Sequence, residues 1–326
     1  MRYLLVAALA CSSGSSAKTE PAAPPPKGRV ETKTFHSDAL GVDKSVVVYL
    51  PGGYDAGTKR YPVFYYLHGL GGDETNWTQV GHLDEAADAI GLQAIVVMPD
   101  GDDSFFIDSP ATIDYDKCIA DGSGLFFPDR PHHATCVKKN DYETYITKDL
   151  IGWADKTYRT VATRDARAIA GLSMGGYGAL MLGMRHPDLF AASASHSGVD
   201  ALLYKGPHPY VAGKVDLESD AKEWGKAIGG MGDWIRSRFG DDIENWRAHD
   251  PAALAGKLDN GKLALYLDCG TEDDFLLNDE ALYLHDILVA RHVDHSYFLG
   301  PGRHDFHFWA ARVGKSLAFL RDHTKV

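Results

Sequence analysis

The 326-residue sequence predicts an α/β fold in which a mostly parallel sheet is covered by helices on both faces. Apolar segments with strand character alternate with amphipathic segments along most of the chain, an order that gives parallel strands joined by crossover helices. The composition agrees, because 44% of the residues are hydrophobic and 24% are charged, as in ordinary globular proteins. The length allows one large domain or two small ones.

The charge balance argues against a nucleic-acid partner. The chain has 33 basic and 45 acidic residues, a formal net charge of −12, whereas nucleic-acid-binding domains carry a basic surface. No apolar run reaches the roughly 20 residues that a membrane-spanning helix needs. We therefore expect neither nucleic-acid binding nor an integral membrane segment in the mature chain.

The N-terminus resembles an export signal. Residues 1–10 have a basic residue at Arg2, continue as a short apolar stretch and end in small residues before Cys11. Ala8-Leu9-Ala10-Cys11 resembles the lipobox of bacterial lipoproteins, in which the cysteine carries lipid. We therefore expect a signal peptide over residues 1–10 and lipidation of Cys11.

A tether and one folded domain follow the signal. Residues 11–29 are rich in serine and then in proline, which predicts a flexible and then stiff linker, and residues 30–326 form the domain. The chain is then a periplasmic or cell-envelope lipoprotein, or a secreted protein, that touches the membrane only through its lipid. A disordered cytosolic N-terminus is the alternative.

The remaining cysteines agree with export. Cys118 and Cys136 lie in one polar stretch rich in Gly, Pro and Asp, where we expect a disulfide to close a long loop. Cys269 lies in an apolar segment and is expected to be a buried free thiol. Three unrelated reduced cysteines are the alternative.

The first half of the domain contains three predicted strands and two predicted helices. The strands are expected over residues 45–50, 63–67 and 94–98, which are apolar apart from Ser45 and are followed by Gly or Pro, or by His68-Gly69. Such runs are typical of strands buried on both faces. Helices are expected over 84–90 and over 141–158, where apolar residues recur at helical spacing.

The second half continues the alternation. Strands are predicted over 167–170, 190–195, 263–267 and 296–299, and helices over 177–185, 280–290 and 307–323. Two long segments, residues 102–140 and 204–260, interrupt the pattern. Excursions at the carboxyl ends of strands build ligand sites in open α/β sheets, so we interpret both as walls of a substrate pocket. Surface insertions without a role are the alternative.

One short motif carries the predicted chemistry. Gly171-Leu172-Ser173-Met174-Gly175 fits G-x-S-x-G between a predicted strand and a predicted helix, which is the context of a nucleophile elbow. The glycines allow a tight turn that exposes the Ser173 hydroxyl and aims the helix N-terminus at developing negative charge. A Gly-rich turn with a capping serine is the alternative.

Serine needs a base to act as a nucleophile, and the base needs a third group to hold it. In this arrangement the acid and then the histidine follow the serine in sequence. His304 lies in the loop after the last predicted strand, at the same sheet edge as Ser173, and is the expected base. His307, about one helical turn further, is the rival.

The acid is expected in the carboxylate-rich loop that follows the strand over 263–267. Asp273 is the candidate, with Asp268 and Asp274 as rivals. Asp268 is expected to remain on the strand, whereas Glu272 and Asp274 are expected to be solvated loop residues.

Two backbone N–H groups are expected to form an oxyanion hole. One belongs to Met174 in the elbow, and the other to Leu70 in the loop His68-Gly69-Leu70-Gly71-Gly72. His68 itself is expected to hold this loop rather than to act as a base.

These motifs together resemble the esterase D family, which includes S-formylglutathione hydrolases, tributyrin esterases, feruloyl esterases and the antigen 85 mycolyltransferases. The resemblance spans about residues 30–322 and includes the segments 66–74, 171–179 and 186–190, with Trp77, Ser197-Gly198, Gly270 and Gly302. It implies an α/β-hydrolase fold, a Ser173–Asp273–His304 triad with oxyanion donors Leu70 and Met174, and no metal or cofactor.

The resemblance implies an ester substrate, either a small molecule or a polysaccharide or lipid ester, cleaved through an acyl-enzyme. Acetyl, short-chain and feruloyl esters are the expected classes. Transfer of the acyl group to another alcohol and hydrolysis of a glutathione thioester are alternatives. Four aromatic residues are candidates to line the substrate pocket: Trp77, Phe105, Phe106 and Trp309.

Two other function classes remain open. A metal hydrolase would use His292-x-x-His295 or His304-x-x-His307, but no H-E-x-x-H motif accompanies either pair. A catalytically inactive binding lipoprotein on the same fold is also compatible with the sequence.

Overall fold

The computed structural model describes residues 26–227 and 230–325. The predicted signal peptide over residues 1–10, Cys11 with its predicted lipid and most of the predicted tether lie outside the described residues. None of the helices in the described ranges is both long enough and apolar enough to cross a membrane.

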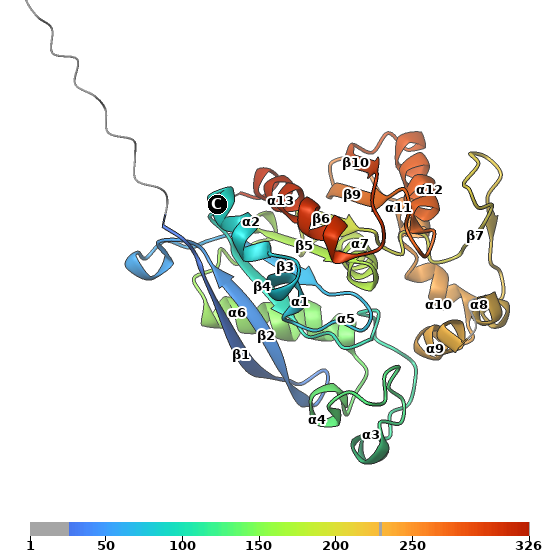
Figure 1. Ribbon diagram of the computed structural model, residues 1–326, viewed down its shortest axis with the longest axis horizontal. Coiled ribbons are helices and arrows are strands. Elements are labelled where there is room, and N and C mark those ends of the chain that lie inside the picture. The colour runs from blue at the N-terminus through green and yellow to red at the C-terminus, as the bar shows by residue number, and fades with distance from the viewer. Residues whose placement is uncertain (1–25, 228–229, 326) are drawn as a thin grey trace, which may run out of the picture.

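A twisted eight-stranded sheet forms the centre of the domain (Figure 1). Its spatial order is β1 (Arg29–Ser37), β2 (Val42–Leu50), β4 (Ile95–Pro99), β3 (Val63–Leu67), β5 (Arg167–Leu172), β6 (Ala192–His196), β9 (Ala264–Gly270) and β10 (His295–Gly300). β2 pairs antiparallel with both β1 and β4, and all pairs from β4 to β10 are parallel. The predicted mostly parallel sheet is therefore confirmed.

The strand β1 was not expected from the sequence pattern. It lies at the edge of the sheet, and its first six residues are exposed or half-buried. An edge strand of this kind lacks the continuous apolar run that marks the buried strands. For the other seven strands of this sheet, the expected and observed bounds differ by no more than three residues.

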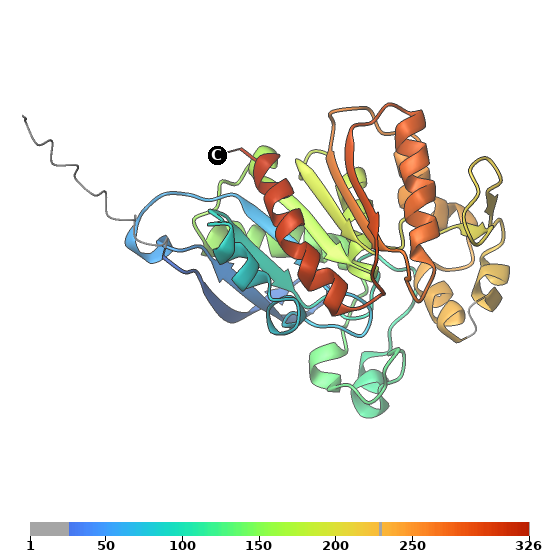
Figure 2. The same ribbon diagram turned by 45° about the horizontal axis from the view of Figure 1, so that its top comes forward.

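Helices cover both faces of the sheet. The helices and turns outside the two long insertions are η1 (Tyr54–Ala56), α1 (Asn76–Gln79), α2 (Leu83–Ala89), α5 (Tyr142–Thr144), the π-helical η2 (Tyr145–Leu150), α6 (Ile151–Thr157), η3 (Arg164–Ala166), α7 (Met174–Arg185), α12 (Leu277–Ala290) and α13 (Phe306–Asp322). The helices α2 and α13 cover one face (Figure 2), and α6, α7 and α12 pack on the other. The helix predicted over 141–158 is thus three consecutive helical segments.

The two hydrophobic cores explain why the central strands are apolar throughout. In β3, Val63, Tyr65 and Leu67 belong to the core under α6, α7 and α12, whereas Phe64 and Tyr66 belong to the core under α2 and α13. Successive side chains of a strand point to opposite faces. A strand between two helical layers therefore needs apolar residues at every position.

Two insertions lie beyond the carboxyl ends of the parallel strands. The segment 102–140 contains α3 (Tyr115–Asp121) and α4 (His132–Thr135), joined by the Cys118–Cys136 disulfide that the sequence predicted. The segment 204–260 contains β7 (Tyr204–Gly206), β8 (Asp216–Leu217), α8 (Ala221–Ala227), α9 (Gly230–Phe239), α10 (Ile243–Ala248) and α11 (Pro251–Ala255). In Figure 1 both project from the same side of the sheet.

Candidate active site

Ser173 occupies the turn between β5 and α7. Its backbone has φ 53° and ψ −121°, a conformation that is strained for a residue with a side chain. The turn is held by two backbone hydrogen bonds, because Ser173 N–H donates to the His196 carbonyl over 2.9 Å and Tyr177 N–H donates to the Ser173 carbonyl over 2.9 Å. This geometry is that of a nucleophile elbow.

The structure brings the three predicted catalytic side chains together. His304 Nε2 lies 2.9 Å from Ser173 Oγ, and His304 Nδ1 lies 2.7 Å from Asp273 Oδ2. His304 comes from the loop after β10 and Asp273 from the loop after β9, and these strands are neighbours in the sheet. The side chain of Asp273 is fully buried and that of His304 is 7% exposed. Both distances allow hydrogen bonds, so a proton can pass from Ser173 to His304.

Asp273 is held by backbone and side-chain donors. Its Oδ1 accepts the N–H groups of Phe275 (3.0 Å) and Leu277 (3.4 Å), and its Oδ2 lies 3.6 Å from the thiol sulfur of Cys269. Cys269 is a free, buried cysteine, as predicted. Burial raises the pKa of the Cys269 thiol, which therefore stays protonated and donates to the carboxylate. The contact with Cys269 was not foreseen.

The rival residues have other partners or are exposed. Asp268 lies on β9, as expected, and Asp274 forms an exposed ion pair with Arg303. Glu272 is exposed in the same loop, and His307 is exposed on α13. None of these four side chains has a hydrogen bond to His304 Nδ1 or to Ser173 Oγ within the described residues.

Asp268 belongs to a second Ser–His–Asp arrangement that lies inside the protein. His196 Nδ1 lies 2.8 Å from Asp268 Oδ1, and His196 Nε2 lies 2.8 Å from Ser316 Oγ. The side chains of His196 and Asp268 are fully buried, so no substrate reaches them. Arg312 also pairs with Asp268 over 3.0 Å. This arrangement joins β6, β9 and α13 and is structural.

The loop of residues 69–72, here called the oxyanion loop, lies against the nucleophile. A Cβ added to Gly69 would approach the Cβ of Ser173 to 3.3 Å. Among the described residues, the N–H of Leu70 has no hydrogen-bond partner, and Met174 is the first residue of α7, whose N–H has no acceptor within the helix. Two free donors beside Ser173 match the requirement of an oxyanion hole.

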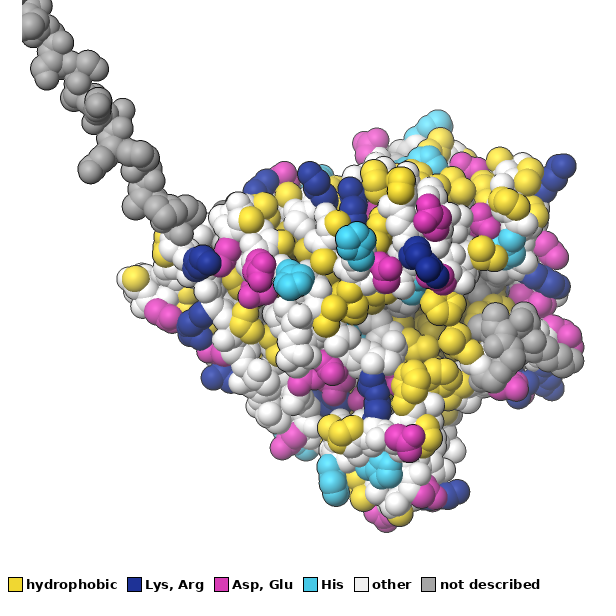
Figure 3. All heavy atoms as spheres, in the orientation of Figure 1, with side chains coloured by type: hydrophobic (Ala, Val, Ile, Leu, Met, Phe, Trp, Pro, Cys, Tyr) yellow, Lys and Arg dark blue, Asp and Glu magenta, His cyan; other side chains and the backbone are white. Residues whose placement is uncertain are grey.

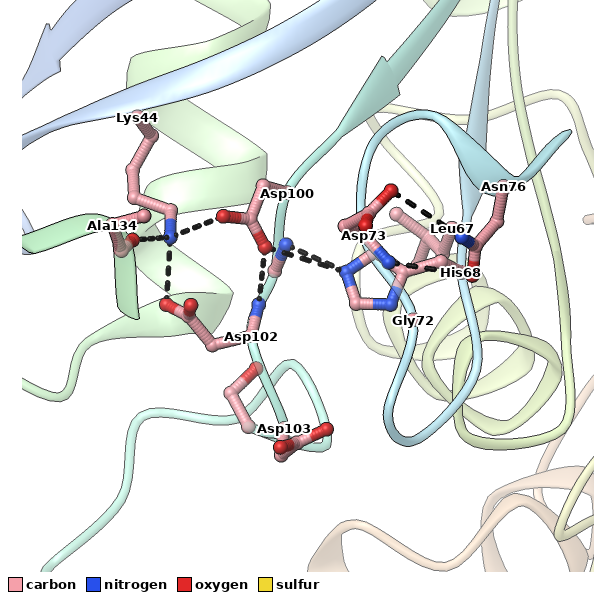
Figure 4. Close-up of polar contacts among 12 residues, drawn as sticks. Lys44, Leu67, His68, Gly72, Asp73, Asn76, Asp100, Asp102, Asp103 and Ala134 are labelled. Atoms are coloured by element: carbon pink, nitrogen blue, oxygen red, sulfur yellow. Dashed lines mark hydrogen bonds and ion pairs between the residues drawn. The ribbon is translucent and has the colours of Figure 1, made fainter. Parts of the chain in front are cut away.

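A buried ionic network lies beside this loop (Figure 4). Lys44 Nζ lies 2.7 Å from Asp100 Oδ2 and 2.8 Å from Asp102 Oδ2. His68 Nε2 accepts the N–H of Gly101 over 2.9 Å, so its Nδ1 carries the proton and donates to the Gly69 carbonyl over 2.8 Å. His68 therefore holds the loop, as the sequence predicted.

The predicted pocket aromatics are core residues. Trp77, Phe105 and Phe106 are at most 3% exposed, and Trp77 donates its indole N–H to the Leu67 carbonyl over 2.9 Å. Trp309, 5% exposed, packs edge-on against His304 with 4.9 Å between ring centroids. The expectation that these four residues line the pocket is corrected, because packing within the fold leaves them almost no surface.

Two exposed aromatic residues that were not predicted flank the site instead. Phe275 is 56% exposed and packs edge-on against His304, with 4.8 Å between ring centroids. Phe127 is 40% exposed and lies against Gly71 of the oxyanion loop. Figure 3 shows hydrophobic side chains over the hollow between the part with α3 and α4 and the part with α8 and α9. Only the tertiary structure reveals these exposed rings.

The two insertions enclose a cavity of about 400 Å³. It is lined by Asp102–Ser104, by parts of residues 111–142 and by Trp234, Ser237 and Arg238 of α9. Neither Ser173 nor His304 lines this cavity. The two insertions therefore form a cavity together, and the catalytic residues are not part of its lining.

The histidine pairs considered for metal binding do not converge. His304 contacts Ser173 and Asp273, whereas His307 is exposed, and His295 contacts His285 rather than His292. Within the described ranges no group of three or more His, Cys, Asp or Glu side chains is placed to hold a metal ion.

A family model described as "Putative esterase" matches residues 37–320. The chain belongs to this esterase family. The match covers most of the chain and confirms the resemblance to the esterase D family that the sequence motifs indicated.

Two relatives resemble about half of the chain. This chain is 31% identical over 168 residues to Esterase Rv1288 of Mycobacterium tuberculosis. The match covers 52% of this chain and 32% of that protein. The chain is 30% identical over 167 residues to the Endo-1,4-beta-xylanase/feruloyl esterase of Xylanibacter ruminicola, covering 50% of this chain and 20% of that protein. The matches thus span a third or less of the length of these relatives.

A solved ferulic acid esterase has the same fold. The two structures superpose with a TM-score of 0.65 at 24% identity, over 91% of this chain and 98% of that chain. The predicted α/β-hydrolase fold class is therefore confirmed.

Proposed function

We propose that this chain is an exported serine carboxylesterase that works through an acyl-enzyme intermediate. The observation that carries the proposal is the hydrogen-bonded series Ser173 Oγ–His304 Nε2 (2.9 Å) and His304 Nδ1–Asp273 Oδ2 (2.7 Å) beside two free N–H donors. Membership of the esterase family supports the same chemistry.

In the first half of the reaction, Ser173 Oγ attacks the ester carbonyl while His304 Nε2 takes its proton. Asp273 holds the imidazole in the tautomer whose Nδ1 carries a proton, and it stabilises the imidazolium. The N–H groups of Leu70 and Met174 bind the oxyanion, and losing one such donor typically costs about 3–4 kcal/mol of barrier. His304 then protonates the departing alcohol, leaving the acyl group on Ser173.

In the second half, a water molecule attacks the acyl-enzyme. His304 takes the proton of this water and returns it to Ser173 Oγ as the acid leaves. An alcohol in place of water would give acyl transfer by the same steps. Only the nucleophile of the second half separates the two reactions.

Esters with an apolar or aromatic acyl group are the proposed substrates. The exposed rings of Phe127 and Phe275 flank the oxyanion loop and His304, respectively. Exposed aromatic rings beside a reacting centre favour apolar or aromatic ligands. The similarity to a relative named as a feruloyl esterase agrees with this class. Comparing kcat/KM for p-nitrophenyl acetate, p-nitrophenyl butyrate and methyl ferulate tests it, and a preference for acetate alone would contradict it.

Export is supported by the Cys118–Cys136 bridge. Disulfides persist in oxidising compartments and are rare in the cytosol. Together with the sequence of residues 1–11, the bridge favours a periplasmic, cell-envelope or secreted protein. Fractionation of cells that produce the chain and its Cys11→Ser variant tests this proposal. Cytosolic recovery of the wild type would contradict export.

The deciding experiment for the chemistry is Ser173→Ala. We expect loss of p-nitrophenyl acetate hydrolysis and of labelling by a fluorophosphonate probe, because no other side chain replaces the attacking hydroxyl. Ser237→Ala is the control, since within residues 26–227 and 230–325 the hydroxyl of this exposed serine bonds only to the Trp234 carbonyl. Retained labelling of the Ser173→Ala variant would reject the assignment. An unreactive wild type would favour an inactive binding protein.

A further inference from the structure

We propose that the disulfide-closed loop of residues 118–136 positions the oxyanion loop through Arg130, so that turnover depends on an intact Cys118–Cys136 bridge. The inference rests on the proposed esterase function and adds a positioning residue and a redox dependence to that site. It is carried by contacts between two loops that are about 60 residues apart in sequence.

Arg130 binds the outer side of the oxyanion loop. Its Nη1 donates to the Gly72 carbonyl over 3.0 Å, and its Nη2 donates to the Gly71 carbonyl. A planar guanidinium that binds two carbonyls fixes the orientation of both. Phe127 fills the space beside Gly71, where an added Cβ would lie 3.1 Å from the ring, and Gly71 has φ +75°. Position 71 therefore accommodates glycine and no residue with a side chain.

Two peptide units link the Gly71 carbonyl, which Arg130 binds, to the N–H of Leu70, the predicted oxyanion donor. The Gly71 carbonyl that Arg130 binds shares a planar unit with the Gly72 N–H, which donates to the Gly69 carbonyl over 2.9 Å. The Gly69 carbonyl in turn shares a planar unit with the N–H of Leu70. Arg130 therefore restrains the direction of the Leu70 N–H through the loop backbone.

Two further hydrogen bonds hold the same loop at Gly69 and Gly71. Gly71 N–H donates to Asp103 Oδ1 over 2.6 Å, and the protonated Nδ1 of His68 donates to the Gly69 carbonyl over 2.8 Å. Both acceptor and donor lie on segments next to the central sheet. Arg130 and Phe127 both come from the disulfide loop, so loss of this loop's conformation would release one side of the oxyanion loop.

The position of Arg130 depends on the closure of its own loop. Cys118 lies in α3 and Cys136 directly follows α4, and the bridge joins these two ends across 18 residues. Lys44 Nζ also holds the Ala134 carbonyl over 3.0 Å, as Figure 4 shows. Opening the bridge restores conformational freedom to the segment that carries Phe127 and Arg130. The hydrogen bonds from the Arg130 guanidinium to the Gly71 and Gly72 carbonyls are then formed for a smaller fraction of the time.

The first arm of the test compares Arg130→Ala and Arg130→Lys with the wild type. For p-nitrophenyl acetate we expect Arg130→Ala to lower kcat about tenfold with KM within twofold, less than the 10²–10³-fold typical of deleting a whole oxyanion donor. Arg130→Lys should recover part of the loss, because it keeps a single donor. Fluorophosphonate labelling should slow in parallel. Arg247→Ala, which removes an exposed arginine paired with Glu244, is the control.

The second arm opens the disulfide. Dithiothreitol passes two electrons and two protons to the bridge, giving the thiols of Cys118 and Cys136 and oxidised dithiothreitol. Because both cysteines are buried, thiol titration must establish reduction, and a Cys118→Ser/Cys136→Ser variant provides the same state without reductant. In the wild-type background we expect reduction of the bridge, or the double cysteine substitution, to lower kcat to the value of Arg130→Ala. In the Arg130→Ala background we expect the same changes to have little further effect on kcat, since coupled changes are not additive.

The outcomes separate this inference from the proposed function. Unchanged kcat in a folded Arg130→Ala variant, or full activity of the protein with an open bridge, would overturn it. A rise in KM alone would make Arg130 a substrate contact and would also overturn it. If Arg130→Ala does not fold, the cysteine variant alone decides. In each case a wild type that reacts with fluorophosphonate at Ser173 leaves the proposed function intact.

Discussion

At the scale of single residues, the candidate site depends on which member of a run of carboxylates turns inward. Asp273 is buried and holds His304, whereas Asp274 beside it is exposed and pairs with Arg303. The two backbone N–H groups of Phe275 and Leu277 bind one oxygen of Asp273 and leave the other for the imidazole. Neighbours of the same residue type therefore have different roles.

Asp273→Asn should lower kcat for p-nitrophenyl acetate by roughly 10³–10⁴-fold, because an amide does not stabilise the imidazolium or select the required tautomer. Glu272→Gln is the matched control, since Glu272 is exposed in the same loop. Steady-state kinetics of the two variants provide the comparison. Similar losses in both would mean that the loop as a whole, rather than Asp273, supports His304.

Asp200 is a buried carboxylate with an unusual pKa. Burial raises the pKa of Asp200 to about 7, although Ser195 Oγ donates to its Oδ1 over 2.8 Å. Its Oδ2 has no partner within the described part of the chain. A folded-state pKa above the unfolded value of about 3.9 means that the folded protein binds the extra proton. This contribution to stability is present below pH 4 and is lost as the pH rises through 7.

Asp200→Asn removes this dependence, since an amide resembles the protonated acid. We expect the free energy of unfolding of the variant, relative to that of the wild type, to increase from pH 4 to pH 7 by on the order of 3 kcal/mol and then to level off. Urea unfolding at several pH values measures the difference. Parallel stability curves would show that Asp200 titrates normally in the folded protein.

At the scale of elements, the elbow requires a close approach between α7 and the end of β3. A Cβ at Gly175, the second residue of α7, would lie 2.4 Å from the Leu67 carbonyl oxygen and 2.5 Å from that of His68. Backbone atoms cannot move aside as a flexible side chain does. Gly175, two residues after the nucleophile, therefore sets the distance between α7 and the end of β3.

Gly175→Ala should lower the melting temperature by several degrees. Overpacking costs about 1–3 kcal/mol, which exceeds the roughly 1 kcal/mol that alanine gains over glycine in a helix. Gly152→Ala in α6 is the control, because nothing lies within 4 Å of its added Cβ. The Gly152→Ala variant should have a melting temperature equal to or higher than that of the wild type. A stable, active Gly175→Ala protein would contradict the close approach.

At the scale of the whole molecule, one buried cation joins three separate segments. Lys44 on β2 contacts Asp100 and Asp102 after β4 and the Ala134 carbonyl in the disulfide loop. The side chain is fully buried. Removing one partner of a buried ion pair leaves charges that no solvent compensates.

Lys44→Met should reduce the free energy of unfolding by about 3–5 kcal/mol. Lys33→Met is the control, because Lys33 lies exposed on the adjacent strand β1, pairs with the half-buried Glu31 and should contribute at most about 1 kcal/mol. Urea unfolding of both variants distinguishes them. Equal effects would show that the network is solvated rather than buried.

The sequence by itself determined the order of the buried strands and of the helices that cover them, the elbow at Ser173 and the candidates for its partners. These features follow from periodicity and from short motifs, which involve neighbouring residues. The elbow, the oxyanion loop and the histidine loop were placed at one sheet edge because parallel strands share that edge.

The tertiary structure alone decided which side chains meet there. It selected Asp273 over Asp268, which bonds to His196 in the core, and it buried the aromatic residues expected in the pocket. It also placed Arg130 on the oxyanion loop. These outcomes depend on contacts between residues tens of positions apart, and such contacts are set by packing, which no local pattern encodes.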